Sequence, residues 1–148
     1  IRITSVLGVA FMDSRTSNPF EVIDEYLDLP HDIHIIDFHG EATSEKIAFA
    51  HYVKDKASAV LGTHTHVQTA DEKIIDSKLA FIRDVGMTGP YMSASGCDLD
   101  AIVTRLRGFG APFIVAESSG QLSGVIITFE ENTPVAIERI LINQDHPY

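Results

Sequence analysis

The chain has 148 residues, of which 45% are hydrophobic, so it is long enough for one domain with a hydrophobic core. Its formal net charge is -10, from 21 acidic and 11 basic residues, which removes the basic surface that duplex nucleic acid or an anionic membrane would require. The sequence has no uninterrupted apolar run of about 18 residues and no secretory leader, and Cys97 is its single cysteine, so we expect a soluble, cytoplasmic protein without an internal disulfide.

The first part of the chain alternates between strand and helix patterns. Residues 6–12 are apolar and predict a strand. Asn18 is a suitable N-cap for a helix that begins at Pro19 and stops at Pro30. Residues 33–38 then predict a second strand.

The same alternation continues through the next segment. Thr43 or Ser44 can cap a helix that extends to about Lys56, and residues 57–61 predict the strand after it. Alternating strands and helices are typical of a parallel α/β sheet, and such sheets bind ligands outside the carboxyl ends of their strands. The residues that follow each strand are therefore the candidates for a functional site.

The remaining elements are a strand, a helix and a strand-rich tail. Asp98 is a suitable N-cap for the helix, and a turn at 131–134 predicts an antiparallel hairpin between the last two strands. The predicted strands are 79–85, 112–116, 124–130 and 135–142, and the predicted helix is 99–109. No linker divides the chain, so residues 1–148 form a portion of a single domain.

Three histidines follow predicted strands. His39 ends one strand, and His64 and His66 follow another within Gly62-Thr63-His64-Thr65-His66. Alternate residues of an extended segment project to one side, with Cα atoms roughly 6.5 Å apart. The two histidines could therefore bind one metal ion jointly, or one each of two neighbouring ions. The alternative is that they are polar turn residues at a strand end.

Carboxylates flank these histidines and the other strand ends, and each could orient a ligating imidazole. The alternative role for each is a helix cap, a surface charge or a loop hydrogen bond. These residues are Asp37, Glu41, Asp71, Asp84 and Glu117. Cys97 has no neighbouring base, so we do not expect it to be a nucleophile.

Three longer strings make a family resemblance specific. They are DFHGEATSEK at residues 37–46, GTHTHVQTAD at 62–71 and DVGMTGPY at 84–91. In this order they resemble the YmdB-type 2′,3′-cyclic-nucleotide phosphodiesterases, a bacterial branch of the calcineurin-like metallophosphoesterases. The resemblance extends from about residue 6 to residue 142. Gly40 and Met92 depart from it, where the family usually has alanine and often has aspartate.

The resemblance implies an α/β fold, as the C-terminal half of a four-layer α/β/β/α metallophosphoesterase sandwich. It implies a metal-dependent hydrolase that uses two divalent or transition-metal ions, iron or manganese, to hydrolyse 2′,3′-cyclic nucleotides or similar small phosphodiesters. Carried over by motif, His39 and His64 would bind one metal ion and His66 the other. A water activated by these ions would attack the phosphodiester.

The family's other ligands and its leaving-group histidine belong to an N-terminal half whose motifs do not occur here. The chain begins Ile1-Arg2-Ile3, without an initiator methionine, and runs directly into a predicted core strand. We therefore expect a C-terminal half that is inactive alone and whose catalytic acid and substrate-binding residues are unidentified. Three neutral imidazoles cannot offset the +4 charge of two divalent ions, so anionic ligands must come from elsewhere.

Two other interpretations remain open at this point. The first is an amidohydrolase-like mononuclear hydrolase, although a (β/α)₈ barrel needs about 250 residues. The second is a non-catalytic assembly segment whose exposed sheet edge pairs with the missing half or with another copy, as a homo-oligomer.

Overall fold

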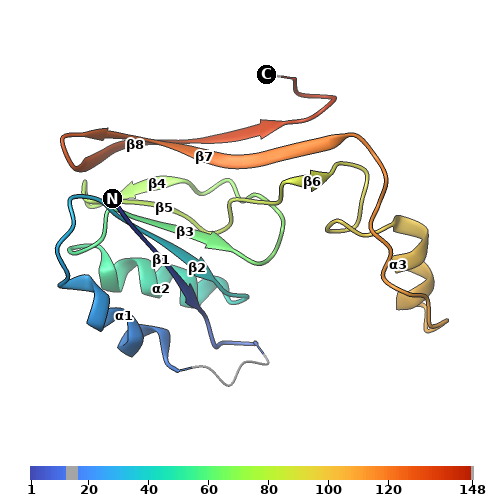
Figure 1. The fold of residues 1–148 in the computed structure, drawn as a ribbon, viewed down its shortest axis with the longest axis horizontal. Helices are drawn as coiled ribbons and strands as arrows, with labels where there is room; N and C mark the ends of the chain where they lie inside the picture. Colours follow the sequence, from blue (N-terminus) through green and yellow to red (C-terminus); the bar gives the residue numbers. More distant parts are fainter. Residues whose placement is uncertain (13–16, 148) are drawn as a thin grey trace.

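The computed structural model describes residues 1–12 and 17–147, which form two β-sheets and three helices (Figure 1). The helices are α1 (Pro19–Leu27), α2 (Thr43–Val53) and α3 (Leu99–Leu106). The strands are β1 (Arg2–Leu7), β2 (His34–His39), β3 (Ala59–Thr63), β4 (Lys73–Ile75), β5 (Leu79–Ile82), β6 (Gly89–Pro90), β7 (Gly120–Glu130) and β8 (Thr133–Ile142).

The larger sheet has the strand order β1-β2-β3-β5-β4. β1, β2, β3 and β5 are parallel, and β4 pairs antiparallel with β5. β6, β7 and β8 form a separate antiparallel sheet. The fold is therefore α/β with a mixed, mainly parallel sheet. An antiparallel strand and a second sheet do not fit a (β/α)₈ barrel, so the amidohydrolase-like interpretation is wrong.

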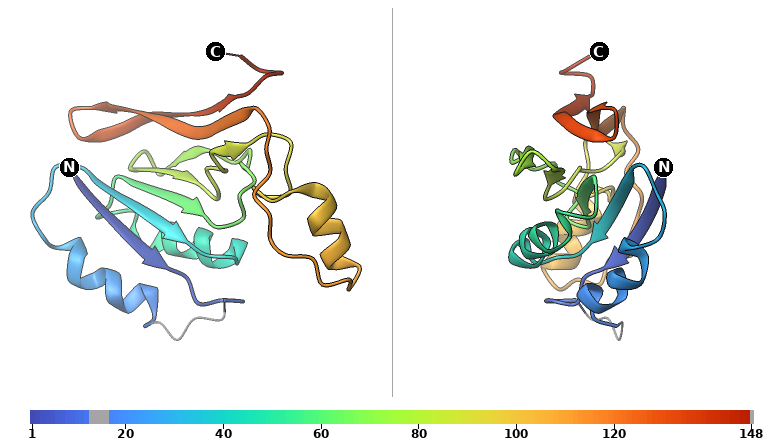
Figure 2. Two further views of the ribbon diagram at one scale, coloured as in Figure 1. Left: turned by 45° about the vertical axis from the view of Figure 1, so that its right-hand side comes forward. Right: turned by 90° about the vertical axis from the view of Figure 1, so that its left-hand side faces the viewer.

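The core lies between the larger sheet and two helices. α1 and α2 cover one face of this sheet, and the β7–β8 hairpin lies over the other (Figures 1 and 2). Ile23 of α1 and Phe49 of α2 are fully buried against Ile36, Phe38 and Phe81 of the sheet. The buried side chains of α1 are apolar and recur at the helical period, whereas the buried face of α2 also contains Glu45 and Lys46.

Most elements predicted from the sequence are present, and some of their ends differ. The Asn18 side chain caps α1 as predicted, because its Oδ1 accepts from Phe20 N at 3.0 Å. α2 differs, since its N-cap is Ala42, without a side-chain bond, and the helix ends at Val53 instead of Lys56. Asp98 caps α3 as predicted.

The first strand is displaced from its predicted position, because it covers Arg2–Leu7 and not residues 6–12. The chain leaves the sheet after Gly8, where the buried carboxylate of Glu45 accepts hydrogen bonds from Val9 N and Ala10 N. These two backbone N–H groups therefore donate to a side chain and not to a neighbouring strand. On its outer edge β1 has no paired strand among the described residues, and Ile3 is 74% exposed there.

The tail differs from prediction in one element. The predicted hairpin is confirmed, with β7 and β8 paired from Leu122↔Ile142 to Glu130↔Thr133. The predicted strand at 112–116 is wrong, because only Val115 makes a bridge there, to Cys97. Within the described ranges, no helix is long and apolar enough to cross a membrane.

Candidate metal centre

His39 and His64 come together at the carboxyl edge of the larger sheet. His39 is the last residue of β2 and lies beside Thr63, the last residue of β3, in the parallel register. Because both strands end at the same level, the residue after β3, His64, lies next to the His39 ring. The parallel sheet therefore brings His39 and His64 together at its carboxyl edge, where ligands are expected to bind.

A chain of hydrogen bonds orients the His39 ring. The hydroxyl groups of Ser5 and Thr63 donate to the Asp37 carboxylate at 3.0 and 2.8 Å, and His39 Nδ1 lies 3.0 Å from Thr63 Oγ1. Because the Thr63 hydroxyl donates its single hydrogen to Asp37, its oxygen accepts a hydrogen bond from Nδ1–H of His39. In the neutral ring Nε2 then carries the lone pair, which is the arrangement found in metal-ligating histidines.

The lone-pair nitrogen of His39 faces His64. His64 Nδ1 lies 3.0 Å from His39 Nε2, and the two rings are perpendicular. On its other side, His64 Nε2 lies 3.2 Å from a carboxylate oxygen of Glu41. If Glu41 accepts a proton from Nε2, the Nδ1 lone pair also faces the gap between the rings, and a shared proton or a cation stabilises that pair of nitrogens.

The distance between these nitrogens suits one metal ion. Two imidazole nitrogens that each lie about 2.1 Å from an ion are about 3.0 Å apart when the angle at the ion is about 90°. The 3.0 Å separation of His39 Nε2 and His64 Nδ1 matches this value. These two side chains can therefore hold an ion together, although the described residues contain no cluster of three or more His, Cys, Asp or Glu side chains that could do so.

A buried ion pair fixes the turn that carries the histidines. The Lys46 ammonium lies 3.2 Å from Asp84 Oδ2 and donates to Thr63 O at 2.7 Å. The Asp84 carboxylate also accepts from Thr65 N at 2.9 Å and from Gly86 N at 3.0 Å. The Lys46 and Asp84 side chains are 2% and 1% exposed, so water does not weaken these bonds.

The turn after β3 is not extended. β3 ends at Thr63, and His64 and His66 have φ angles of +109° and +65°, so the expected side-by-side projection from an extended segment is wrong. Gly62 permits a close approach of the backbone of Arg83 just before the turn. A Cβ atom there would lie 1.7 Å from Arg83 O, a distance that no side chain can adopt without moving the backbone.

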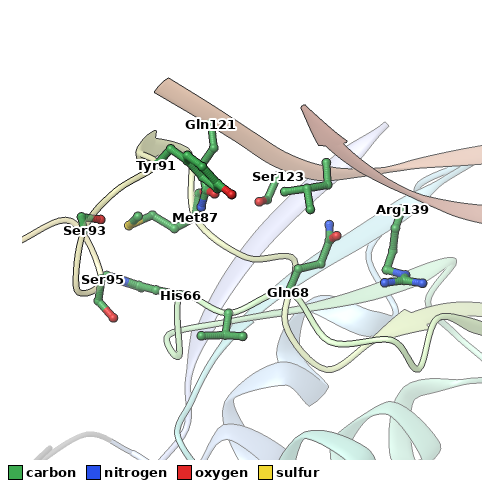
Figure 3. A pocket seen from close by; sticks show the side chains of 11 residues that line it. His66, Gln68, Met87, Tyr91, Ser93, Ser95, Gln121, Ser123 and Arg139 are labelled. Carbon is green, nitrogen blue, oxygen red and sulfur yellow. The ribbon is translucent and has the colours of Figure 1, made fainter. Parts of the chain in front are cut away.

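His66 faces a pocket of about 340 Å³ between this turn and the hairpin (Figure 3). Its side chain lines one end of the pocket, and Arg139 of β8 lines the opposite end (Figure 3). Gln68 lies between them and ties the turn to the hairpin, because its Nε2 donates to the carbonyls of Gly124 and Ile140. His66 thus lies in the wall of a cleft, apart from the His39–His64 contact.

The five carboxylates singled out in the sequence have different roles. Asp37 acts on His39 through Thr63, and Glu41 contacts His64. Asp84 holds backbone groups and Lys46, whereas Asp71 pairs with Arg83 at 2.7 Å and Glu117 is exposed. The sequence reasoning missed Lys46, although its position four residues before Ala50 places it on the buried stripe of α2.

His34 is a buried histidine outside this centre. It is the first residue of β2, where its Nε2 is 2.9 Å from Thr4 Oγ1, and Ser58 Oγ accepts from its backbone N–H. Burial, followed by the charges of His31 and Arg2, lowers the pKa of His34 to about 4. The ring is therefore neutral in the folded protein near neutral pH.

Comparison with known proteins gives consistent matches to this chain. It is 53% identical over 116 residues to the 2′,3′-cyclic-nucleotide 2′-phosphodiesterase of Bacillus subtilis, a match that covers 76% of this chain and 44% of that protein. The crystal structure of a hypothetical protein from Thermus thermophilus matches with a TM-score of 0.89 and 38% identity. That of a novel phosphatase from Mycoplasma pneumoniae matches with a TM-score of 0.87 and 35% identity.

The two solved structures are each matched over 95% of this chain, and over 56% and 52% of their own chains respectively. The chain thus spans about half the length of the relatives that it matches. The model of the YmdB-like protein family matches residues 1–140. The resemblance found in the sequence is therefore confirmed, and the chain belongs to the YmdB-like protein family.

Proposed function

We propose that this chain is the C-terminal half of a metal-dependent phosphodiesterase domain with an α/β/β/α sandwich fold. In this proposal His39 and His64 bind one divalent metal ion and His66 binds a second. The proposed substrates are 2′,3′-cyclic nucleotides or similar small phosphodiesters. The printed name of the Bacillus subtilis relative supports this substrate class.

The observation that carries the proposal is the pair of facing imidazole nitrogens at the sheet edge. His39 Nε2 and His64 Nδ1 are 3.0 Å apart, and partners on the far side of each ring hold both in place. With the far nitrogen of each ring bonded to Thr63 or Glu41, both facing nitrogens can act as ligands to one metal ion. The donor set is compatible with iron or manganese, because imidazole binds several first-row metals.

The residues of this chain would contribute orientation and rigidity to the reaction. When bound, such ions polarise the phosphoryl oxygens and lower the pKa of a water nucleophile. Thr63 and Asp37 keep the Nε2 atom of His39 directed towards His64. The Lys46–Asp84 pair fixes the backbone of the turn that carries His64 and His66. The pocket beside His66 provides space for a small ester, with the Arg139 guanidinium at its other end.

The remaining half of the domain is also part of the proposal. The imidazoles named here are neutral ligands, so carboxylates from that half would balance the charge of two divalent ions. That half would also cover the exposed outer edge of β1, where Ile3 would otherwise remain in water. A non-catalytic assembly role would use the same edge but would not require the His39–His64 geometry.

The test measures metal content and hydrolysis on the same samples of the full-length protein. We expect about two transition-metal ions per chain by elemental analysis, and hydrolysis of 2′,3′-cyclic AMP and of bis-p-nitrophenyl phosphate. His39→Asn, His64→Asn and His66→Asn should each remove activity and lower the metal content. His51→Asn is the matched control, because His51 is exposed on α2, away from the sheet edge.

Two results would contradict the proposal. One is a folded full-length protein that holds metal and hydrolyses no phosphodiester. The other is activity that survives substitution of all three histidines to the same extent as it survives His51→Asn. Metal retained without activity would favour the assembly role.

A further inference from the structure

The pocket between the turn of His66 and the β7–β8 hairpin differs in charge from the rest of the chain. The chain has a formal net charge of -10, yet no carboxylate is among the described residues that line this pocket. Of those lining residues, only Arg139 carries a permanent charge. A cavity with this lining favours an anionic ligand over a neutral or cationic one.

A carboxylate outside the pocket holds the Arg139 side chain. Arg139 Nε lies 2.8 Å from Glu72 Oε1, and Glu72 is not among the lining residues. The hydrogen bond from Arg139 lowers the pKa of Glu72, so this carboxylate is ionised at neutral pH. Because the pair uses Nε, the terminal NH₂ groups of the guanidinium have no salt-bridge partner in the described ranges. A guanidinium oriented in this way is suited to binding a phosphate group.

Arg139 and His66 lie at opposite ends of the pocket (Figure 3). In the proposed function, the phosphodiester that reacts lies at the His66 end, beside the metal ions. An anionic group bound by Arg139 is therefore a second group of the substrate, and not the phosphodiester itself. This step rests on the proposed function.

The part of the pocket between these two ends suits a nucleoside. Met87 and Tyr91 provide apolar and aromatic contact there, and Gln121 and Ser123 provide polar groups (Figure 3). The volume of about 340 Å³ is typical of a small-molecule site. The ribose of a 2′,3′-cyclic nucleotide carries the cyclic phosphate on one face and its C5′ group on the other. A phosphate on the 5′ oxygen is thus a second anion that the same molecule can present.

We propose that Arg139, held by Glu72, binds a phosphate on the 5′ oxygen of the substrate. The preferred substrates are then 2′,3′-cyclic nucleotides that carry a 5′-linked phosphate. Such a phosphate occurs in a 5′-phosphorylated mononucleotide and at the 3′ end of a single-stranded oligonucleotide. Both present the same group to the guanidinium, and bonds between arginine and phosphate are among the stronger hydrogen bonds in proteins.

Hydrolysis by the full-length protein tests this preference. The substrates are adenosine 2′,3′-cyclic phosphate with and without a 5′-phosphate. We expect the 5′-phosphate to raise kcat/KM about 10–100-fold in the wild type, the value of a hydrogen bond between charged groups, and to have almost no effect in Arg139→Gln. Comparing the two substrates within each variant makes the result independent of the fraction of folded protein.

Arg83→Gln is the matched control. Arg83 also pairs through Nε with a carboxylate, that of Asp71 at 2.7 Å, and 33% of its side chain is exposed against 39% for Arg139. It does not line the pocket, so its variant should keep the wild-type ratio. A dinucleotide that ends in a 2′,3′-cyclic phosphate distinguishes the two sources, because a higher kcat/KM than that of the 5′-phosphorylated mononucleotide identifies oligonucleotide ends as the source.

Binding to the metal-free protein separates this inference from the proposed function. After metal removal with EDTA, calorimetry compares adenosine 5′-phosphate with adenosine. We expect the phosphate to strengthen binding about tenfold or more in the wild type and not in Arg139→Gln. A wild type that does not discriminate between the paired compounds overturns the inference, as do equal effects of Arg139→Gln and Arg83→Gln. Binding that depends on Arg139 without any hydrolysis supports the phosphate site and contradicts only the proposed function.

Discussion

Removing the Lys46 ammonium is the most informative single change outside the histidines. Lys46→Met keeps the length of the side chain on the buried stripe of α2 but leaves the Asp84 carboxylate, 1% exposed, without its counter-charge. Breaking a buried ion pair on one side costs about 3–5 kcal/mol. Asp84 retains hydrogen bonds from Thr65 N and Gly86 N, which places the expected loss near the lower value.

Urea unfolding followed by circular dichroism measures this loss of free energy. A loss of about 3 kcal/mol shifts the thermal midpoint by roughly 10 °C for a domain of this size. Lys56→Met is the matched control, because its pair with Asp28 is exposed and should leave the urea midpoint almost unchanged. Adding Asp84→Asn to Lys46→Met should recover part of the loss, since a neutral amide can be buried without a counter-charge.

The outcome that refutes this reasoning is a Lys46→Met variant as stable as Lys56→Met. It would mean that water or another cation reaches Asp84, and that the turn of His64 is not held by the buried pair. A double variant that is less stable than Lys46→Met would also contradict the charge argument.

Three further predictions concern single residues near the sheet. Gly62→Ala should destabilise the protein by about 1–3 kcal/mol, because its Cβ would lie 1.7 Å from Arg83 O, whereas Gly124→Ala, with no atom within 4 Å of the added Cβ, should change the urea midpoint little. Thr63→Val should lower metal affinity by roughly 10–100-fold in a competition titration, because it removes the bond that orients His39, and unchanged affinity would refute that role. The pKa of His34 is lowered to about 4 in the folded chain. As the pH decreases, the unfolded chain therefore binds a proton on this ring at a higher pH than the folded chain does. The stability of the folded chain above about pH 6.5 should consequently fall as the pH decreases towards 4. His34→Gln should make the urea midpoint less sensitive to pH between about 7 and 5, and an unaltered pH profile would contradict this assignment.

The predictable parts of the fold are those encoded within a few residues. Asn18 followed by Pro19 specifies the start of α1, and the turn predicted at 131–134 between two apolar runs specifies the β7–β8 hairpin. Both signals depend on neighbouring residues alone, so tertiary contacts do not alter them. The position of His39 and His64 at one sheet edge also followed from the alternation of strands and helices.

The unpredicted parts depend on contacts between distant segments. After Gly8 the chain leaves the sheet, where Glu45, 35 or more residues away, accepts from the backbone N–H groups of Val9 and Ala10. The positive φ angles of His64 and His66 accompany the hydrogen bond from Thr65 N to Asp84. No local pattern encodes such contacts, and the short β4 and β6 likewise form only against β5 and β7.

The adjacent residues Glu45 and Lys46 connect one helical turn to two separate loops. Glu45 binds the backbone after β1, and Lys46 binds Thr63 O and Asp84. The loop that carries His64 therefore becomes rigid only after α2 and the residues following β5 have all reached their native positions. In amide hydrogen exchange, the Thr65 N–H should thus exchange only when α2 separates from the larger sheet. Its exchange rate therefore measures how often the larger sheet and α2 come apart.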